Sequence, residues 1–193
     1  MKKLIVGVTG ASGSVYAYRL TEVLLELGNT VHFVATDNGK KVMAYEMEIP
    51  FPTIIDNFAE KSKQFHYHDN DNLFEVIASG SYGVDGMVVA PCSMGTLGKA
   101  SQGIGDTLLT RSIDVMLKEQ QTLILGVRET PLNPIHLENM LKMSRMGVFI
   151  LPPVPAFYHH PKSLDDIIDI YVGRVLKTLK IENTLHRIWK DTE

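Results

Sequence analysis

The sequence is short of cysteine and of long hydrophobic runs, and each shortage excludes a class of protein. Cys92 is the one cysteine among 193 residues, so no disulfide can form within the chain, as in proteins of a reducing cytoplasm. No apolar stretch is long enough to span a bilayer, and the N-terminus lacks the apolar core and cleavage site of a signal peptide. We therefore expect a cytoplasmic protein with no membrane span.

Positive charge is also scarce. Lysine and arginine number 19 against 22 aspartates and glutamates, the formal net charge is -3, and there is no long basic run. This balance argues against nucleic acid or an anionic membrane as the main partner. Hydrophobic residues make up 45% of the chain, enough for a sizeable core in one domain, so small molecules and other copies of the chain remain as expected partners.

Buried strands and amphipathic helices alternate along the chain. Residues 4–8 are aliphatic, as in a strand buried on both faces of a parallel sheet, and the glycines that follow allow a sharp turn into a helix at 15–27. A second strand at 30–35 and a helix capped by Thr36 repeat this unit, which makes the sheet parallel. Further strands are expected at 86–91, 123–127 and 148–151, and further helices at 106–119, 134–146 and 164–179. The pattern predicts an α/β fold with a doubly wound, mostly parallel, three-layer sheet.

Two features have competing interpretations. The segment FHYHDND holds four potential metal ligands, His66, His68, Asp69 and Asp71. We favour a solvated loop there, because a flexible loop lacks a second scaffold to complete a coordination shell. Cys92 could be a nucleophile, but no histidine adjoins it in the sequence, so we expect a buried thiol that packs beside a strand end.

Small and charged residues follow several of the expected strands. Ser93 and Thr96 start a helix after one strand, Arg128 and Glu129 follow another, and Tyr158 lies in a proline-rich segment after the last. The carboxyl ends of parallel strands share one edge, where α/β proteins bind ligands, so we expect a site there. Unfilled amides at the N-terminus of the helix at 15–27 would favour an anion, most often a phosphate.

Seven short segments carry a family resemblance. In chain order they are TGASG, ASGS, PCSMGT, DVMLKE, VRETPL, IHLENML and PPVPAFYHHP, and together they resemble the UbiX flavin prenyltransferase family over nearly the whole chain. The resemblance implies a Rossmann-like (flavodoxin-like) domain at 1–181 that binds FMN and forms a homo-oligomer, a dodecamer. It also implies that the protein joins a dimethylallyl group from dimethylallyl phosphate to reduced FMN without a metal, and supplies prenylated FMN to a UbiD-type decarboxylase.

The resemblance also implies which residues form the site. The FMN site falls on Gly10, Ala11, Ser12, Thr36, Ser93, Met94, Gly95, Thr96 and Arg128. The dimethylallyl phosphate site falls on Ser79, Arg111, Lys118, Tyr158 and Arg174. Cations and hydroxyls of this kind can hold a phosphate monoester as the allylic carbon–oxygen bond breaks.

The implied mechanism is attack on the allylic carbon by the central-ring nitrogen of the reduced flavin, followed by ring closure. Ser12 and Glu129 are expected to handle protons, Lys118 to stabilise the leaving phosphate and Glu46 to shape the pocket. Trp189 could add π surface beside a carbocation-like transition state. Because this ring is costly to expose, we expect the tail at 182–193 to pack on the same or a neighbouring subunit.

Some positions depart from the family pattern. Thr36 replaces a serine that is common in the family, but it keeps the hydroxyl. Gln120 and Gln121 stand where two arginines are common, and Leu73 lies about where some members carry an aromatic residue that lines the pocket. The first change should matter little, the second leaves no cationic role for those positions, and the third could alter the fit of the prenyl tail.

Two other functions compete with this one. FMN-dependent cysteine decarboxylases carry a PxMNxxMW-like segment, and the corresponding PLNPIHLENML in this chain disfavours that group. The second is a non-catalytic FMN-binding accessory subunit of a hydroxyarylic acid decarboxylase. An enzyme would turn over reduced FMN and dimethylallyl phosphate, whereas an accessory subunit would only bind the flavin.

Overall fold

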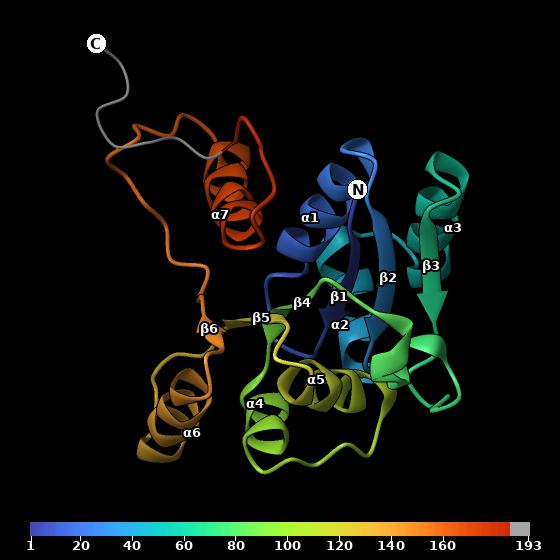
Figure 1. The fold of residues 1–193 in the computed structure, drawn as a ribbon. Helices are drawn as coiled ribbons and strands as arrows, with labels where there is room; N and C mark the ends of the chain where they lie inside the picture. The colour runs from blue at the N-terminus through green and yellow to red at the C-terminus, as the bar shows by residue number, and fades with distance from the viewer. Residues whose placement is uncertain (186–193) are drawn as a thin grey trace. The chain divides into compact units, whose positions relative to one another are not determined.

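Six parallel strands form one sheet in the order β3, β2, β1, β4, β5 and β6 (Figure 1). The structure is a computed structural model that describes residues 1–185. Its strands are β1 (Lys3–Val8), β2 (Thr30–Ala35), β3 (Phe65–His68), β4 (Gly86–Cys92), β5 (Thr122–Val127) and β6 (Phe149–Ile150). The strand order reverses where β4 pairs with β1 on the side away from β2, so the doubly wound α/β fold is confirmed.

Helices connect the strands and cover both faces of the sheet. They are α1 (Ser14–Glu26), α2 (Asp37–Met47), α3 (Phe51–Lys61), α4 (Met94–Ser101), α5 (Leu108–Lys118) and α6 (Pro134–Arg145), with two short 3-10 helices, η1 (Val76–Ala78) and η2 (Gly80–Tyr82). The residues of each central strand alternate between two cores. Ile5 and Val34 pack in the cluster that contains Ile113 of α5. Leu4 and Phe33 are buried outside that cluster, toward the face that α1 and α2 contact, so the three-layer arrangement is confirmed.

Local sequence signals locate most helix ends correctly. Thr36 and Asn133 cap α2 and α6 with their side chains, as expected, and Gly28 ends α1 with a φ of 76° that favours glycine. These ends depend on residues within one helical turn, which is why the sequence alone predicts them.

Two parts of the chain between α2 and β4 differ from what the sequence predicts. Pro52 lies in the first turn of α3, where a missing amide is tolerated, and α3 is a helix that the sequence pattern does not predict. Residues 65–68 of the histidine-rich segment form the edge strand β3, and His68 is buried. The loop prediction for this part of the segment is therefore wrong.

A chain of hydrogen bonds runs through the two buried histidines. His68 Nδ1 lies 2.8 Å from Glu75 Oε2, His32 Nδ1 lies 2.8 Å from His68 Nε2, and the Tyr82 hydroxyl lies 3.1 Å from His32 Nε2. An ionised carboxylate can only accept, so His68 Nδ1 donates to Glu75. Where His68 Nε2 accepts, His32 Nδ1 donates to it and the Tyr82 hydroxyl donates to His32 Nε2.

This burial predicts a loss of stability in acid. Desolvation, together with the nearby His68, His66 and Lys3, lowers the pKa of His32 from its ordinary 6.5 to about 4. Between these values the unfolded chain binds more protons than the folded one, so the free energy of unfolding should decrease as pH falls from 6.5 toward 4. The loss should be on the order of 3 kcal/mol in total. Urea unfolding at fixed protein concentration over this pH range measures it.

The matched variants are His32→Gln, which removes the titrating group, and His136→Gln, which alters a partly exposed histidine of α6. We expect the pH slope to flatten in His32→Gln and to persist in His136→Gln. Equal slopes in the wild type and His32→Gln would contradict the assignment to His32.

The chain divides into two compact units, Met1–Pro152 and Pro153–Glu193. The second unit contains α7 (Leu164–Thr178), whose N-terminus has the expected Ser163 cap and a capping box completed by Asp166. The division into one domain at 1–181 and a C-terminal tail at 182–193 stays a prediction.

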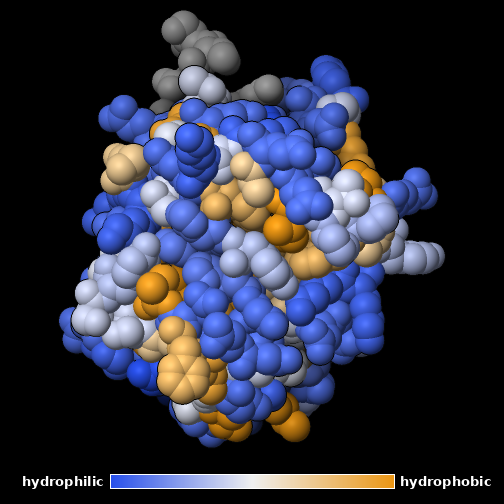
Figure 2. Space-filling view, turned by 90° about the vertical axis from the view of Figure 1, so that its right-hand side faces the viewer, coloured by the Kyte–Doolittle hydropathy of each residue, from blue (hydrophilic) through white to orange (hydrophobic). Residues whose placement is uncertain are grey.

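On the face drawn in Figure 2, hydrophobic side chains form small separate patches among hydrophilic ones. Within the described residues, every helix is too short or too polar to cross a bilayer.

Candidate functional site

The carboxyl ends of β1, β2, β4 and β5 bring together most residues of the expected FMN site. Gly10, Ala11 and Ser12 follow β1, Thr36 follows β2, Ser93 follows β4 and Arg128 follows β5. The amide of Thr36 donates to Val8 O over 3.0 Å, and the amide of Arg128 donates to Cys92 O over 3.1 Å. Main-chain hydrogen bonds therefore hold neighbouring loops together at this edge, which contains the switch point between β1 and β4.

The N-terminus of α1 already holds an anion from the chain itself. Glu46, at the end of α2, accepts hydrogen bonds from the Gly13 amide at 3.0 and 3.1 Å and from the Ser14 amide at 2.8 Å. The expectation that these amides are unfilled is therefore wrong. Glu46 lies more than 30 residues away in the sequence, so no local pattern could predict this contact.

Glu46 is held in its ionised form. Partial burial alone would raise the pKa of this carboxyl, but hydrogen bonds from the Ser12 side chain and from the Ser14 and Gly13 amides outweigh burial and lower it. The buried Ser14 hydroxyl also favours the carboxylate, although it makes no hydrogen bond of good geometry within residues 1–185.

The N-terminus of α4 is open by comparison. Ser93 Oγ accepts from the Thr96 amide at 3.4 Å and lies 3.1 Å from the Thr96 hydroxyl. The amides of Met94 and Gly95 make no hydrogen bond within residues 1–185, and a Cβ built on Gly95 would meet no atom within 4 Å. Two free amides, two hydroxyls and open space beside a glycine fit the phosphate group of FMN.

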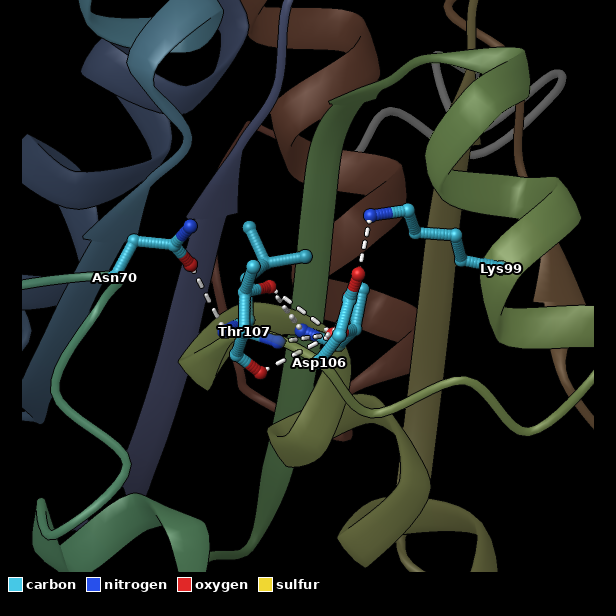
Figure 3. Close-up of polar contacts among 6 residues, drawn as sticks. Asn70, Lys99, Asp106 and Thr107 are labelled. Carbon is cyan, nitrogen blue, oxygen red and sulfur yellow. Dashed lines mark hydrogen bonds and ion pairs between the residues drawn. The ribbon is translucent and has the colours of Figure 1, made fainter.

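The first amides of α5 are already hydrogen-bonded within the chain. Asn70 accepts from the Leu108 amide with its main-chain oxygen at 2.8 Å and from the Leu109 amide with its side chain at 3.1 Å. Figure 3 shows Asn70 on one side of Thr107 and the Lys99–Asp106 pair, 2.7 Å apart, on the other. These contacts satisfy the first turn of α5, so α4 is the better position for a phosphate.

Arg128 and Glu129 are exposed directly after β5, as expected. Glu129 Oε1 accepts from the Thr130 amide at 3.0 Å, while Oε2 makes no hydrogen bond within residues 1–185. One oxygen is thus fixed by the main chain, and the other can accept a proton from a ligand.

Ser79, Arg111 and Lys118 lie along α5 and the two 3-10 helices, and the structure places Lys118 away from this edge. Lys118 ends α5 four residues before β5 begins, and it pairs with Glu119, whose carboxylate lies against Gly80. Arg111 Nε donates to Ala78 O at 3.2 Å, next to Ser79. These three residues therefore line the seam between α5 and η1–η2.

The Lys118 end of this seam lies at the amino edge of the sheet. There Lys3, the first residue of β1, donates from Nζ to Tyr82 O at 3.3 Å. Since α5 leads directly into β5, its last residue must lie where β5 starts, whereas Arg128 lies where β5 ends. One copy of the chain thus places Lys118 and the FMN residues at opposite edges.

A cavity of about 380 Å³ also opens at the amino edge. It lies between the end of α5 and the turn from α6 to β6, and it is lined by Met116, Leu117, Gln120, Gln121, Leu123, Met146, Gly147 and Val148. It shares no residue with the FMN set, so it is separate from the candidate site.

Two further residues of the expected substrate set lie in the second unit. Tyr158 is exposed and its ring lies 4.2 Å from that of His159, and Arg174 lies on an exposed face of α7. Trp189 falls outside the described residues.

Two residues have structural roles at this edge. Cys92 is fully buried, and desolvation raises its pKa to about 12, which leaves it a neutral thiol, as expected. Thr9 was not predicted, although its buried hydroxyl contacts both Pro91 and Ser93. The sequence signal that could have identified Thr9 is a polar residue at the end of an aliphatic strand.

No group of three or more potential metal-ligating side chains occurs in the part of the chain that the structure describes.

The fold and this edge define a Rossmann-like protein that binds a phosphate-bearing ligand at the switch point of its sheet. The sequence matches the Flavoprotein family over residues 1–176. It is 48% identical to the flavin prenyltransferase UbiX of Halalkalibacterium halodurans, over 95% of this chain and 91% of that protein. The chain therefore belongs to the flavoprotein family and, within it, to the UbiX flavin prenyltransferases.

Two solved structures resemble the whole chain. AnUbiX in complex with FMN and dimethylallyl pyrophosphate has a TM-score of 0.91 and 36% identity, covering 100% of this chain and 99% of that one. A dodecameric FMN-dependent UbiX-like decarboxylase from Escherichia coli O157:H7 has a TM-score of 0.88 and 42% identity, covering 97% and 99%.

Proposed function

We propose that this protein joins a dimethylallyl group from dimethylallyl phosphate to reduced FMN and releases prenylated FMN for a UbiD-type decarboxylase. The observation that carries the proposal is that open helix amides, an ionised Glu46 and the Arg128–Glu129 pair all lie at one sheet edge. The same chain matches a flavin prenyltransferase over 95% of its length.

The residues of α4 and Arg128 would hold the flavin. The amides of Met94 and Gly95 and the hydroxyls of Ser93 and Thr96 suit the phosphate, and the Arg128 cation adds charge at the same edge. When bound, reduced FMN supplies the ring nitrogen that becomes joined to the allylic carbon.

Ser12 and Glu129 would manage protons. The Ser12 side chain helps to keep the pKa of the neighbouring Glu46 carboxyl low, and its hydroxyl is able both to donate to and to accept from a ligand. The Thr130 amide fixes one oxygen of Glu129, and the other is available to accept a proton.

Ser79, Arg111, Lys118, Tyr158 and Arg174 are the proposed ligands of the dimethylallyl phosphate. Lys118 lies at the amino edge of its own sheet, so we infer that a neighbouring copy of the chain supplies it. A homo-oligomer is therefore part of the proposal, and the dodecameric relative supports it.

Incubation under anaerobic conditions with FMN, dithionite and dimethylallyl phosphate tests the function. We expect the released flavin to gain the mass of one five-carbon prenyl unit and to change its absorbance, and the same mixture without donor should return FMN. A protein that binds FMN but returns it unchanged with both the phosphate and the diphosphate donor would be a non-catalytic accessory subunit.

A further inference from the structure

Thr9 links β1 to β4 at the switch point through a fully buried hydroxyl. The exposed fraction of Thr9 is 0%, its hydroxyl donates to Pro91 O over 2.8 Å, and the same oxygen accepts from the Ser93 amide over 2.8 Å. The side chain therefore uses both its donor and one acceptor position, and it bridges residues more than 80 positions away in the sequence.

The regular pairing of the two strands ends before this point. The register of β1 with β4 runs from Leu4↔Gly86 to Gly7↔Val89, and the pairing of β4 with β5 is irregular between Val89 and Cys92. Pro91 has no amide to donate. Beyond the ladder, the Thr9 amide adds one bond to Pro91 O at 3.3 Å, and the Thr9 hydroxyl adds the other two contacts.

Ser93 connects this bridge to the open amides of α4. The Ser93 amide is held by Thr9, and Ser93 Oγ caps the helix at Thr96. Met94 and Gly95 follow directly, so the direction of their free amides depends on where Ser93 is fixed. A rotation at Ser93 would turn both amides away from a phosphate without unfolding the helix.

We propose that Thr9 is a positioning residue for the flavin phosphate: its hydroxyl fixes the N-terminus of α4 against the loop after β1. The proposal rests on the proposed function, because it assigns the α4 amides to the phosphate of FMN. Thr9 itself is buried and bonded on both sides, so it acts through Ser93 and does not touch the ligand.

The test compares Thr9→Val, which keeps the shape and loses the hydroxyl, with Thr9→Ser, which keeps the hydroxyl. Thr21→Val is the matched control, because Thr21 is also fully buried and its hydroxyl donates to Ala17 O over 2.8 Å inside α1. The dissociation constants of FMN and of riboflavin are measured for each variant, together with the melting temperature and the turnover at saturating FMN.

We expect Thr9→Val to weaken FMN binding by roughly tenfold, while riboflavin, which lacks the phosphate, binds about as it does to the wild type. Thr9→Ser should restore FMN affinity, and Thr21→Val should leave it unchanged. Turnover at saturating FMN should fall much less than affinity in Thr9→Val.

Equal losses for FMN and riboflavin in Thr9→Val, or a lower melting temperature with unchanged FMN affinity, would reduce Thr9 to a structural role and overturn the proposal. If Thr9→Val does not fold, Thr9→Ser and Thr9→Ala are titrated instead, and equal FMN affinity in these two also overturns it. A wild-type protein that binds neither flavin would refute the proposed function, which is a different outcome.

Discussion

Replacement of Glu129 by glutamine is expected to slow prenyl transfer by about 10²- to 10⁴-fold, the range over which a positioned acid or base contributes to catalysis. Glutamine keeps an oxygen that can accept from the Thr130 amide, now 3.0 Å from Glu129 Oε1, so the main chain after β5 should stay in place. The substitution therefore removes mainly the capacity of the side chain at position 129 to take up a proton. Formation of prenylated flavin under single-turnover conditions measures the rate.

Two controls separate proton transfer from other causes. Glu60→Gln changes the net charge equally at an exposed position of α3 and should leave the rate unchanged. FMN affinity should be the same in Glu129→Gln and the wild type, because the flavin phosphate is assigned to α4. A Glu129→Gln enzyme with a wild-type rate would remove Glu129 from the mechanism and leave Ser12 as the remaining candidate.

Local signals explain how much of this fold could be predicted. The aliphatic run of β1 and the caps at Thr36, Asn133 and Ser163 act within a few residues, and each element that depends on them lies where the sequence indicates. The loop expected at 65–71 is wrong for residues 65–68, because they form the short edge strand β3, in which the polar His68 is buried. The buried His68 ring is hydrogen-bonded to Glu75 and to His32 of β2, and no periodicity could link these residues to it.

The candidate site likewise contains residues that local sequence predicts and contacts that it does not predict. Gly10 to Ser12, Ser93 and Arg128 follow strands that the sequence predicts, so their common edge could be inferred from parallel topology. The Glu46 contact with α1 and the Thr9 bridge to β4 join segments that are distant in the sequence, so no local pattern predicts either contact.

The placement of Lys118 could have been inferred from topology. A helix that precedes a parallel strand ends at the amino edge of the sheet, so a cation at the end of α5 cannot reach the carboxyl edge of its own sheet. Because of this geometry, the proposed site needs two copies of the chain.

Co-expression of two inactive variants is expected to restore activity. Lys118→Ala removes the cation assigned to the leaving phosphate, and Glu129→Gln removes the proton acceptor, so each homo-oligomer alone should be slower by on the order of 10²-fold or more. If one copy supplies Lys118 to the site that contains its neighbour's Glu129, random mixing leaves roughly a quarter of the sites with both residues intact. Assemblies that carry two different affinity tags are purified, and their turnover is compared with that of each variant alone.

The matched control mixes Lys118→Ala chains with chains that carry both substitutions, in which every site lacks Lys118 and turnover should stay at the level of the single variants. If Lys118 instead served the site of its own chain, no site in the first mixture would hold both residues, and activity would not return. Recovery to roughly a quarter of the wild-type rate in the first mixture, with none in the second, therefore requires that the phosphate-binding cation cross from one copy to another. That result would show that catalysis requires the oligomer, because a single chain holds the two halves of the site at opposite edges of its sheet.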